Sequence, residues 1–259
     1  MATPEPTPEP LAEGTLISHL LELRARLLRA VLAVLLVAVP CMVFANELFT
    51  LVARPLLKVL PKGAVMLSTN VMAPLVAPFK LAFYVALIVA MPYVLYQIWA
   101  FVAPGLYKHE KRFALPLLVS SVLLFYCGIA FAYFAVFPLM FVFLTTTAPI
   151  GVQVMPDMTQ YLDLVLMLFI AFGIAFEIPI AIVLLVRSGL VRIESLKRNR
   201  GYVLIGVFVQ AAIIVPPDVV SQTLMALPMY ALYEIGIVMA RLLAREKIAE
   251  KAREAAEGG

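Results

Sequence analysis

Charged residues, cysteine and histidine are scarce in this 259-residue chain. Only 14% of its residues are charged, two are cysteine and two are histidine. No polar stretch is long enough for a separate soluble domain, so the composition indicates one integral membrane domain. Cys41 and Cys127 fall within apolar segments, where we expect small buried hydrophobic side chains and no disulfide. His19 and His109 stand alone and far apart in sequence, so no metal site is expected.

Three further signatures are missing from the sequence. It contains no glycine loop for a nucleotide phosphate, no pairing of a nucleophile with a base, and no interleaving of aromatic with basic residues. These absences argue against an enzyme, against a bound cofactor and against nucleic acid as a partner. The basic excess follows from membrane topology instead.

Long apolar runs dominate the chain, and most of them approach the ~20 residues that a helix needs to cross the ~30 Å hydrocarbon core. The sequence therefore predicts an all-α integral membrane protein with six transmembrane helices. The predicted spans are Arg26–Asn46, Lys80–Phe101, Phe113–Phe143, Tyr161–Val186, Tyr202–Val215 and Val220–Ala240.

Lysine and arginine concentrate in alternate connections between these runs. Sixteen of the twenty lie just before or at the start of the first run, in the second and fourth connections and their borders, or in the C-terminal tail. The other four, Arg54, Lys58, Lys62 and Lys80, lie in the first connection or at its border with the second run. The positive-inside rule then places both termini in the cytoplasm.

The chain divides into three parts by composition. Residues 1–14, rich in proline and glutamate, are expected to be a disordered tail. Residues 15–240 form the six-span membrane domain and start with an amphipathic interfacial helix. Residues 241–259 form a charged cytoplasmic helical tail. In the external loop Glu47–Pro78, the apolar stretch interrupted by Pro55 predicts a short helix that caps the bundle.

Prolines and span lengths predict an uneven bundle. Six prolines lie inside or at the ends of the spans, where each removes a backbone donor, so we expect a kinked, concave bundle. The last two helices are expected to be short, because about fifteen uncharged residues follow Tyr202 and Glu234 interrupts the final run.

Glu177 lies midway through the fourth run, among apolar neighbours. A charge there is costly on insertion scales, so it should face protein or water, or be protonated. One interpretation is a polar patch with Gln210 and Gln222 that receives a polar group from a partner helix. The alternative is a buried carboxyl that is hydrogen-bonded for helix packing. Gln97 in the second run is a further polar exception.

Glu22 and Glu110 each lie among basic residues in segments predicted to be cytoplasmic. Taken alone, each is typical of an ordinary surface ion pair of little energetic value. The surrounding motifs favour a different interpretation.

Several separated motifs resemble the TatC family, the multi-spanning core of the twin-arginine protein translocase. The entry signature HLxELR is present as His19-Leu20-Leu21-Glu22-Leu23-Arg24. The first cytoplasmic loop of the family matches Phe101, Pro104, Leu106-Tyr107 and Glu110-Lys111. The segments FGIAFEIP, PPDVVSQ and ALPMYALYEIG follow in the family's order. Gln210 departs from it, because an apolar residue is expected at that position.

The resemblance implies a receptor for twin-arginine signal peptides in the bacterial cytoplasmic (inner) membrane. With single-span partners of the TatA and TatB type, it would use the proton-motive force to move folded proteins across the membrane. It would contact membrane lipids and self-associate in a larger complex. Glu22 and Glu110 would each hold one guanidinium. The resemblance assigns signal-peptide binding to Glu22, Arg24, Phe101, Pro104, Leu106, Tyr107 and Glu110, partner-helix contact to Glu177, Gln210 and Gln222, and subunit assembly to Pro55.

Two other classes of function stay open on the residues alone. A proton-coupled small-solute transporter would also carry intramembrane carboxylates, but it should have repeated halves with broken helices. An intramembrane enzyme would need a nucleophile and a base on neighbouring spans.

Overall fold

The computed structural model describes residues 11–59, 66–106, 114–147, 155–215 and 218–257, and these are almost entirely helical. Five helical stretches in this part of the chain are long and apolar enough to cross a membrane, and a shorter apolar helix lies between the last two. The elements are α1 (Leu11–Val43), α2 (Ala45–Val59), α3 (Ala73–Leu106), α4 (Ala114–Phe131), the π-helical η2 (Ala132–Val136), α5 (Phe137–Thr146), α6 (Met158–Arg187), α7 (Ile193–Arg198), α8 (Arg200–Ile214) and α9 (Val219–Glu257).

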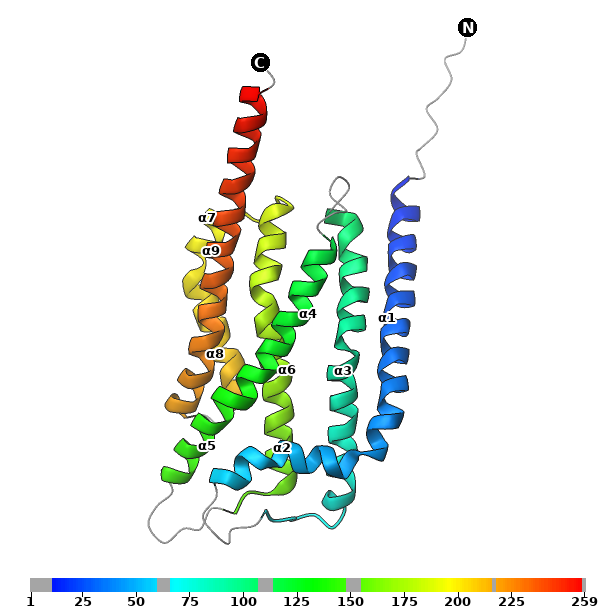
Figure 1. Ribbon diagram of the computed structural model, residues 1–259, viewed down its shortest axis with the longest axis vertical. Coiled ribbons are helices and arrows are strands. Elements are labelled where there is room, and N and C mark those ends of the chain that lie inside the picture. The colour runs from blue at the N-terminus through cyan, green and yellow to red at the C-terminus, as the bar shows by residue number, and fades with distance from the viewer. Residues whose placement is uncertain (1–10, 60–65, 107–113, 148–154, 216–217, 258–259) are drawn as a thin grey trace.

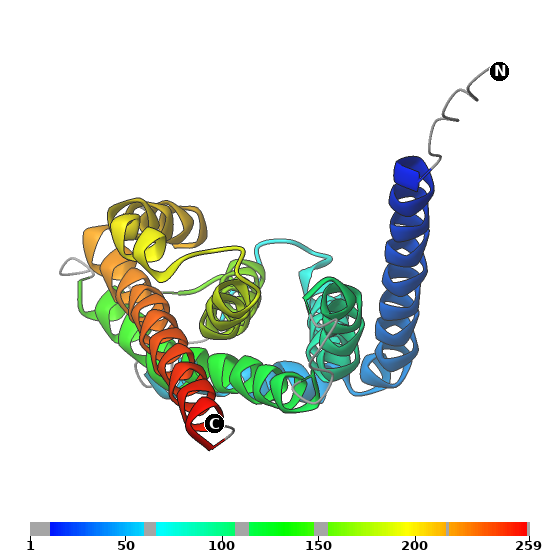
Figure 2. The same cartoon turned by 90° about the horizontal axis from the view of Figure 1, so that it is seen from above.

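The long helices run roughly parallel to one axis, and the start of α1 and the end of α9 lie at the same end of the bundle (Figure 1). Helix α2 lies across the opposite end (Figure 1). Seen from above, the helices form an open row with α1 at one extreme and α8 at the other (Figure 2). The bundle therefore leaves much apolar surface uncovered by protein, as expected where lipid is the solvent.

Helix α1 is continuous from Leu11 to Val43, so the expected amphipathic entry helix and the first span form one element. It begins inside the segment 1–14 that we expected to be disordered, and residues 1–10 lie outside the described ranges. Most of its apolar side chains are exposed, because α1 packs on α3 and on little else. This isolated position makes one face of α1 available to a ligand or to lipid.

A π-helical turn interrupts the α-helical hydrogen bonding of the third apolar run. The Phe137 N–H bonds to the carbonyl of Ala132, five residues back, and Pro138 follows in the first turn of α5. Proline has no N–H to continue the ladder, so the extra residue of the π-turn absorbs the local mismatch. The helix thus departs from regular α-helical hydrogen bonding beside a proline, and the expected kink stays a prediction.

The last apolar helix is longer than we expected. Helix α8 has 15 residues, in agreement with the expected short fifth span, but α9 is an uninterrupted helix of 39 residues with an apolar part from Val219 to Ala244. Glu234 does not end it, because Arg200 Nη2 lies 2.6 Å from Glu234 Oε2 and the Tyr230 hydroxyl donates to Oε1 at 3.1 Å. A compensated charge can remain inside an apolar helix.

The core lies where α6 crosses α4, η2 and α9. Aromatic rings fill it, with Phe137 and Phe172 fully buried and ring centroids 5.5 Å apart for the pair Phe137 and Phe169. Close helix contact depends on glycine. A Cβ at Gly128 would lie 2.5 Å from the Phe172 carbonyl oxygen, and one at Gly236 would lie 2.9 Å from Cα of Pro179. These close contacts set the positions along α6 at which α4 and α9 cross it.

Both cysteines are free, but they are not the buried side chains that we expected. Cys127 is exposed and Cys41 is partly exposed. On an apolar helix with no protein neighbour on that side, an exposed thiol behaves as a small lipid-facing group.

Candidate functional site

The carboxylate of Glu22 binds a guanidinium from its own helix. Arg26 donates from Nη2 and Nε to Glu22 Oε1 at 2.6 and 2.9 Å. A third nitrogen, Nη1, lies 3.5 Å from Oε1 of the buried Gln97 in α3. Oε2 of Glu22 has no hydrogen-bond partner among the described residues. Helix α1 thus presents a carboxylate of which one oxygen, Oε1, binds Arg26 from the same helix.

The remaining residues of this predicted site are placed unevenly. Arg24 is exposed on α1, and Phe101 is partly buried on α3. Pro104 and Leu106 belong to the last turns of α3, where the structure does not describe side chains. Tyr107 and Glu110 lie outside the described residues. The pairing of Glu22 with Glu110 therefore stays a prediction.

A second polar cluster joins three helices near Glu177. The Trp99 indole Nε1 of α3 donates to Ser121 Oγ of α4 at 2.9 Å, and the Ser121 hydroxyl donates to Glu177 Oε2 of α6 at 2.5 Å. Ser121 is fully buried and Glu177 is half-buried. Oε1 of Glu177 is buried as well, with no partner among the described residues. One oxygen is thus fixed by packing, while the other keeps its capacity to accept.

The structure does not bring Glu177 together with Gln222. Gly236 of α9 contacts α6 at Pro179, two residues from Glu177, whereas Gln222 lies fourteen residues earlier along α9. At 1.5 Å per residue this is about 21 Å of helix. Gln210 is exposed and lines a cavity between α3, α6 and α8. The three polar residues occupy three separate positions.

The predicted cap is a helix, α2, and two tyrosines bond to it. Pro55 has no N–H for the carbonyl of Leu51, and that carbonyl accepts from the Tyr133 hydroxyl at 3.2 Å. The next carbonyl, of Val52, accepts from the buried Tyr161 hydroxyl at 2.8 Å. The side chain of Pro55 is outside the description. Its position in the helix nevertheless explains why a carbonyl is available to Tyr133.

Sequence reasoning missed Trp99, Ser121 and Arg26 as members of these clusters. Trp99 is the only tryptophan of the chain, and Ser121 is a hydroxyl inside an apolar run; both are signals for a buried hydrogen bond. Arg26 lies four residues after Glu22, the spacing of a helical ion pair. Among the described residues, no group of three or more His, Cys, Asp and Glu side chains could hold a metal ion.

An open row of apolar helices with internal polar clusters defines a multi-pass helical membrane protein. A protein family described as "Sec-independent protein translocase protein (TatC)" matches this sequence over residues 18–228. The chain belongs to this family. It is 54% identical to the "Sec-independent protein translocase protein TatC" of Azotobacter chroococcum mcd 1, over 90% of this chain and 91% of that protein. The protein of the same name from Escherichia coli K12 is also 54% identical, over 87% and 88%.

The fold agrees with that assignment. A solved structure described as "Twin Arginine Translocase Receptor- TatC" superposes with a TM-score of 0.80, at 41% identity, covering 86% of this chain and 98% of that one. The family is a component of protein transport and not an enzyme. Protein translocation therefore replaces both the solute-transporter and the intramembrane-enzyme alternatives.

Proposed function

We propose that this chain is the receptor subunit that binds twin-arginine signal peptides at the cytoplasmic face of the bacterial inner membrane. The observation that carries the proposal is the contact between Glu22 and Arg26. It is a guanidinium bound to a partly exposed carboxylate, 2.6 Å away, toward the end of the bundle where α1 begins and α9 ends (Figure 1). A signal-peptide arginine offers the same group.

In this proposal Arg26 forms an ion pair with Glu22 in the absence of a signal peptide. The pair is partly exposed, with side-chain exposures of 21% for Arg26 and 41% for Glu22, so it contributes at most ~1 kcal/mol. An incoming guanidinium can bind Oε2 or displace Arg26 from Oε1, and Gln97 then accepts the displaced cation. Glu110 receives the second arginine of the signal, with Arg24, Phe101, Pro104, Leu106 and Tyr107 completing the surface.

The topology required is six spans with both ends in the cytoplasm and α8 as the short fifth span. The distribution of sixteen basic residues against four supports it. Fifteen residues of α8 cover about 22 Å, less than the ~30 Å core, so the bilayer should thin beside it. Cysteine labelling tests this orientation: an impermeant reagent should label a cysteine added near Gly151 in intact cells, and should not label one near Ser195.

The same proposal extends to partners. One buried oxygen of Glu177 has no partner in the part of the chain that the structure describes, which suits a polar group arriving on a TatA-like or TatB-like helix. Gln222 would serve a separate contact, given its distance from Glu177 along α9, and Gln210 would contact a partner from α8. The α2 cap with Pro55 would carry self-association in a larger complex, and the proton-motive force would drive transport.

A photoreactive twin-arginine peptide tests receptor function. Glu22→Gln and Glu110→Gln should each reduce crosslinking about tenfold or more, since each removes a charged hydrogen-bond acceptor. Glu194→Gln, at an exposed acidic position in α7, is the matched control and should crosslink like the unmodified protein. Unchanged crosslinking in both site variants would contradict the proposal.

A further inference from the structure

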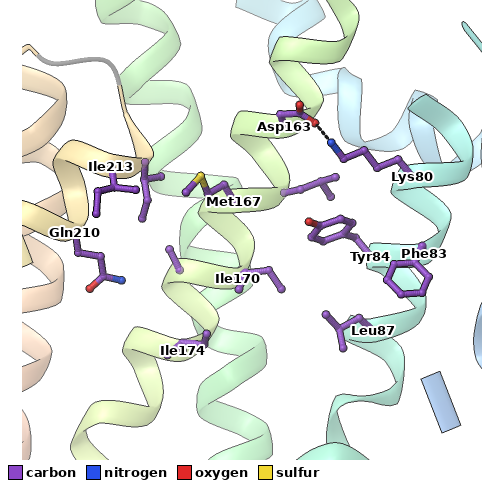
Figure 3. Close-up of a pocket in the computed structure, with 13 residues that line it drawn as sticks. Lys80, Phe83, Tyr84, Leu87, Asp163, Met167, Ile170, Ile174, Gln210 and Ile213 are labelled. Carbon is purple, nitrogen blue, oxygen red and sulfur yellow. Dashed lines mark hydrogen bonds and ion pairs between the residues drawn. The ribbon is translucent and has the colours of Figure 1, made fainter. Parts of the chain in front are cut away.

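A cavity of about 730 Å³ opens between α3, α6 and α8, and neither Glu22 nor Glu177 is among the residues that line it. An ion pair between Lys80 of α3 and Asp163 of α6 stands at one end (Figure 3). The walls beyond it are mostly apolar and include Leu87, Ile170 and Ile174, while Gln210 of α8 adds one polar side chain (Figure 3). The cavity is thus charged at one end and mostly apolar along its length.

The depth of this cavity matches one leaflet of a bilayer. Asp163 lies five residues into α6, near the end of the bundle crossed by α2 (Figure 1). Ile174 lies eleven residues further along the same helix, which is about 16 Å at 1.5 Å per residue. Half of a ~30 Å hydrocarbon core is about 15 Å. The polar end therefore stands at the headgroup level when the apolar wall spans one leaflet.

The ion pair offers both signs of charge to a ligand. The side chains of Lys80 and Asp163 are 39% and 49% exposed, so each retains room for a second partner. A purely anionic headgroup would bind Lys80 but would face the carboxylate of Asp163. A headgroup that carries a phosphate and an ammonium can lie antiparallel to the pair, so that each of the four charges has an opposite neighbour.

We propose that this cavity binds one phospholipid with a primary ammonium headgroup, phosphatidylethanolamine, from the leaflet on the α2 side. Its phosphate bonds to Lys80, its ammonium donates to Asp163, and an acyl chain lies along Ile170 and Ile174. A primary ammonium has three N–H donors, whereas a quaternary choline has none, so the carboxylate selects the former. This lipid site is independent of signal-peptide binding and goes beyond the proposed function.

Native mass spectrometry of the full chain, released from nanodiscs with equal phosphatidylethanolamine and phosphatidylglycerol, tests the site. The unmodified protein should retain one phosphatidylethanolamine, preferred about tenfold over phosphatidylglycerol. Asp163→Asn should abolish that preference, because only the ammonium loses its partner. Lys80→Gln should reduce retention of both lipids about tenfold, since both carry a phosphate.

Two further variants separate the cavity from general lipid contact. Ile170→Trp fills the apolar wall from a partly buried position and leaves the ion pair intact, and it should reduce retention of both lipids. Lys197→Gln removes an exposed cation from α7, outside the cavity, and should behave like the unmodified protein. Equal retention by the Ile170→Trp variant, or an unchanged preference in Asp163→Asn, would overturn the proposal.

A photoreactive residue at position 174 distinguishes a lipid from a helix of another protein. Attachment to phosphatidylethanolamine in whole membranes supports the site. Attachment to a single-span protein in place of lipid would show that the cavity is a helix-docking groove, and would also overturn the lipid assignment.

Discussion

The Ser121 hydroxyl donates to the Glu177 carboxylate at 2.5 Å, and it is the one described group that bonds to this acid. Ser121 is itself held by the Trp99 indole. Helices α3, α4 and α6 are thereby joined through one carboxyl oxygen, while the other faces no described donor. The packing interpretation and the partner interpretation of Glu177 are compatible, because each uses a different oxygen.

Ser121→Ala should destabilise the bundle by about 1–3 kcal/mol, since it leaves a buried indole N–H and a carboxyl oxygen without partners. Thermal unfolding in detergent measures the loss. Ser120→Ala is the control, because the Ser120 hydroxyl bonds only within α4, to the Leu117 carbonyl at 2.9 Å. It should change stability by a few tenths of a kcal/mol.

A double-mutant cycle decides whether the Ser121 effect acts through Glu177. In a Glu177→Ala background, Ser121→Ala should cost clearly less than in the unmodified protein, because their interaction is already gone. Equal costs in the two backgrounds would assign the effect to Trp99 instead.

Arg26→Gln should strengthen twin-arginine peptide binding up to about fivefold. In this variant no guanidinium on α1 competes with the peptide for Glu22. Breaking the partly exposed Glu22–Arg26 ion pair costs at most ~1 kcal/mol, and peptide binding should gain that free energy. Titration of a fluorescent signal peptide into the purified protein measures the change. Arg29→Gln, which removes an exposed cation one turn further along α1, should have a smaller effect. Weaker binding by the Arg26 variant would show that Arg26 orients Glu22 instead of occupying it.

The segment before α3 is hydrogen-bonded to the carboxylate of Asp157 at the start of α6. Asp157 caps α6 by accepting from the backbone N–H groups of Thr159 and Gln160, and it accepts from the Thr69 hydroxyl at 2.6 Å. The Thr69 hydroxyl, followed by backbone donors of Gln160 and Thr69, lowers the pKa of Asp157 to about 2. The link therefore favours the ionised carboxylate.

Stability should consequently depend on pH at this position. A folded-state pKa below the unfolded value gives stabilisation that is complete above about pH 4 and is lost as the pH falls toward 2. Asp157→Asn keeps an N-cap side chain but has no charge, so the melting-temperature difference between the two proteins should shrink over this range. A constant difference from pH 6 to pH 2 would contradict the assignment.

The sequence predicted the helical spans well because apolar length is a one-dimensional property. Each predicted run lies within a helical stretch or overlaps one, and α8 has the short length that its proline turn indicated. The failure at α9 arose from Glu234, which seemed to shorten the span. Its compensating partner, Arg200, is on another helix, and no local pattern reveals a cation thirty-four residues away.

The polar clusters were harder to predict for the same reason. The cost of a charge in an apolar run singles out Glu177, but its grouping with Gln222 takes no account of the height at which α9 crosses α6. That height is set by the contact of Gly236 with Pro179, which depends on tertiary packing. From the sequence alone, Arg26 counts only among the basic residues that set the membrane orientation, although its four-residue spacing from Glu22 is visible there.

The central claim, one acceptor formed by Glu22 and Glu110, is tested most directly by peptide binding to both single alanine variants and to the double variant. Each should be measured with a twin-arginine signal and with a signal in which one arginine is lysine. We predict a loss of about ten- to hundredfold for each single variant, and a smaller loss with the lysine signal because the two defects share an interaction. Full binding by the double variant, or strictly additive losses across all combinations, would contradict the shared acceptor.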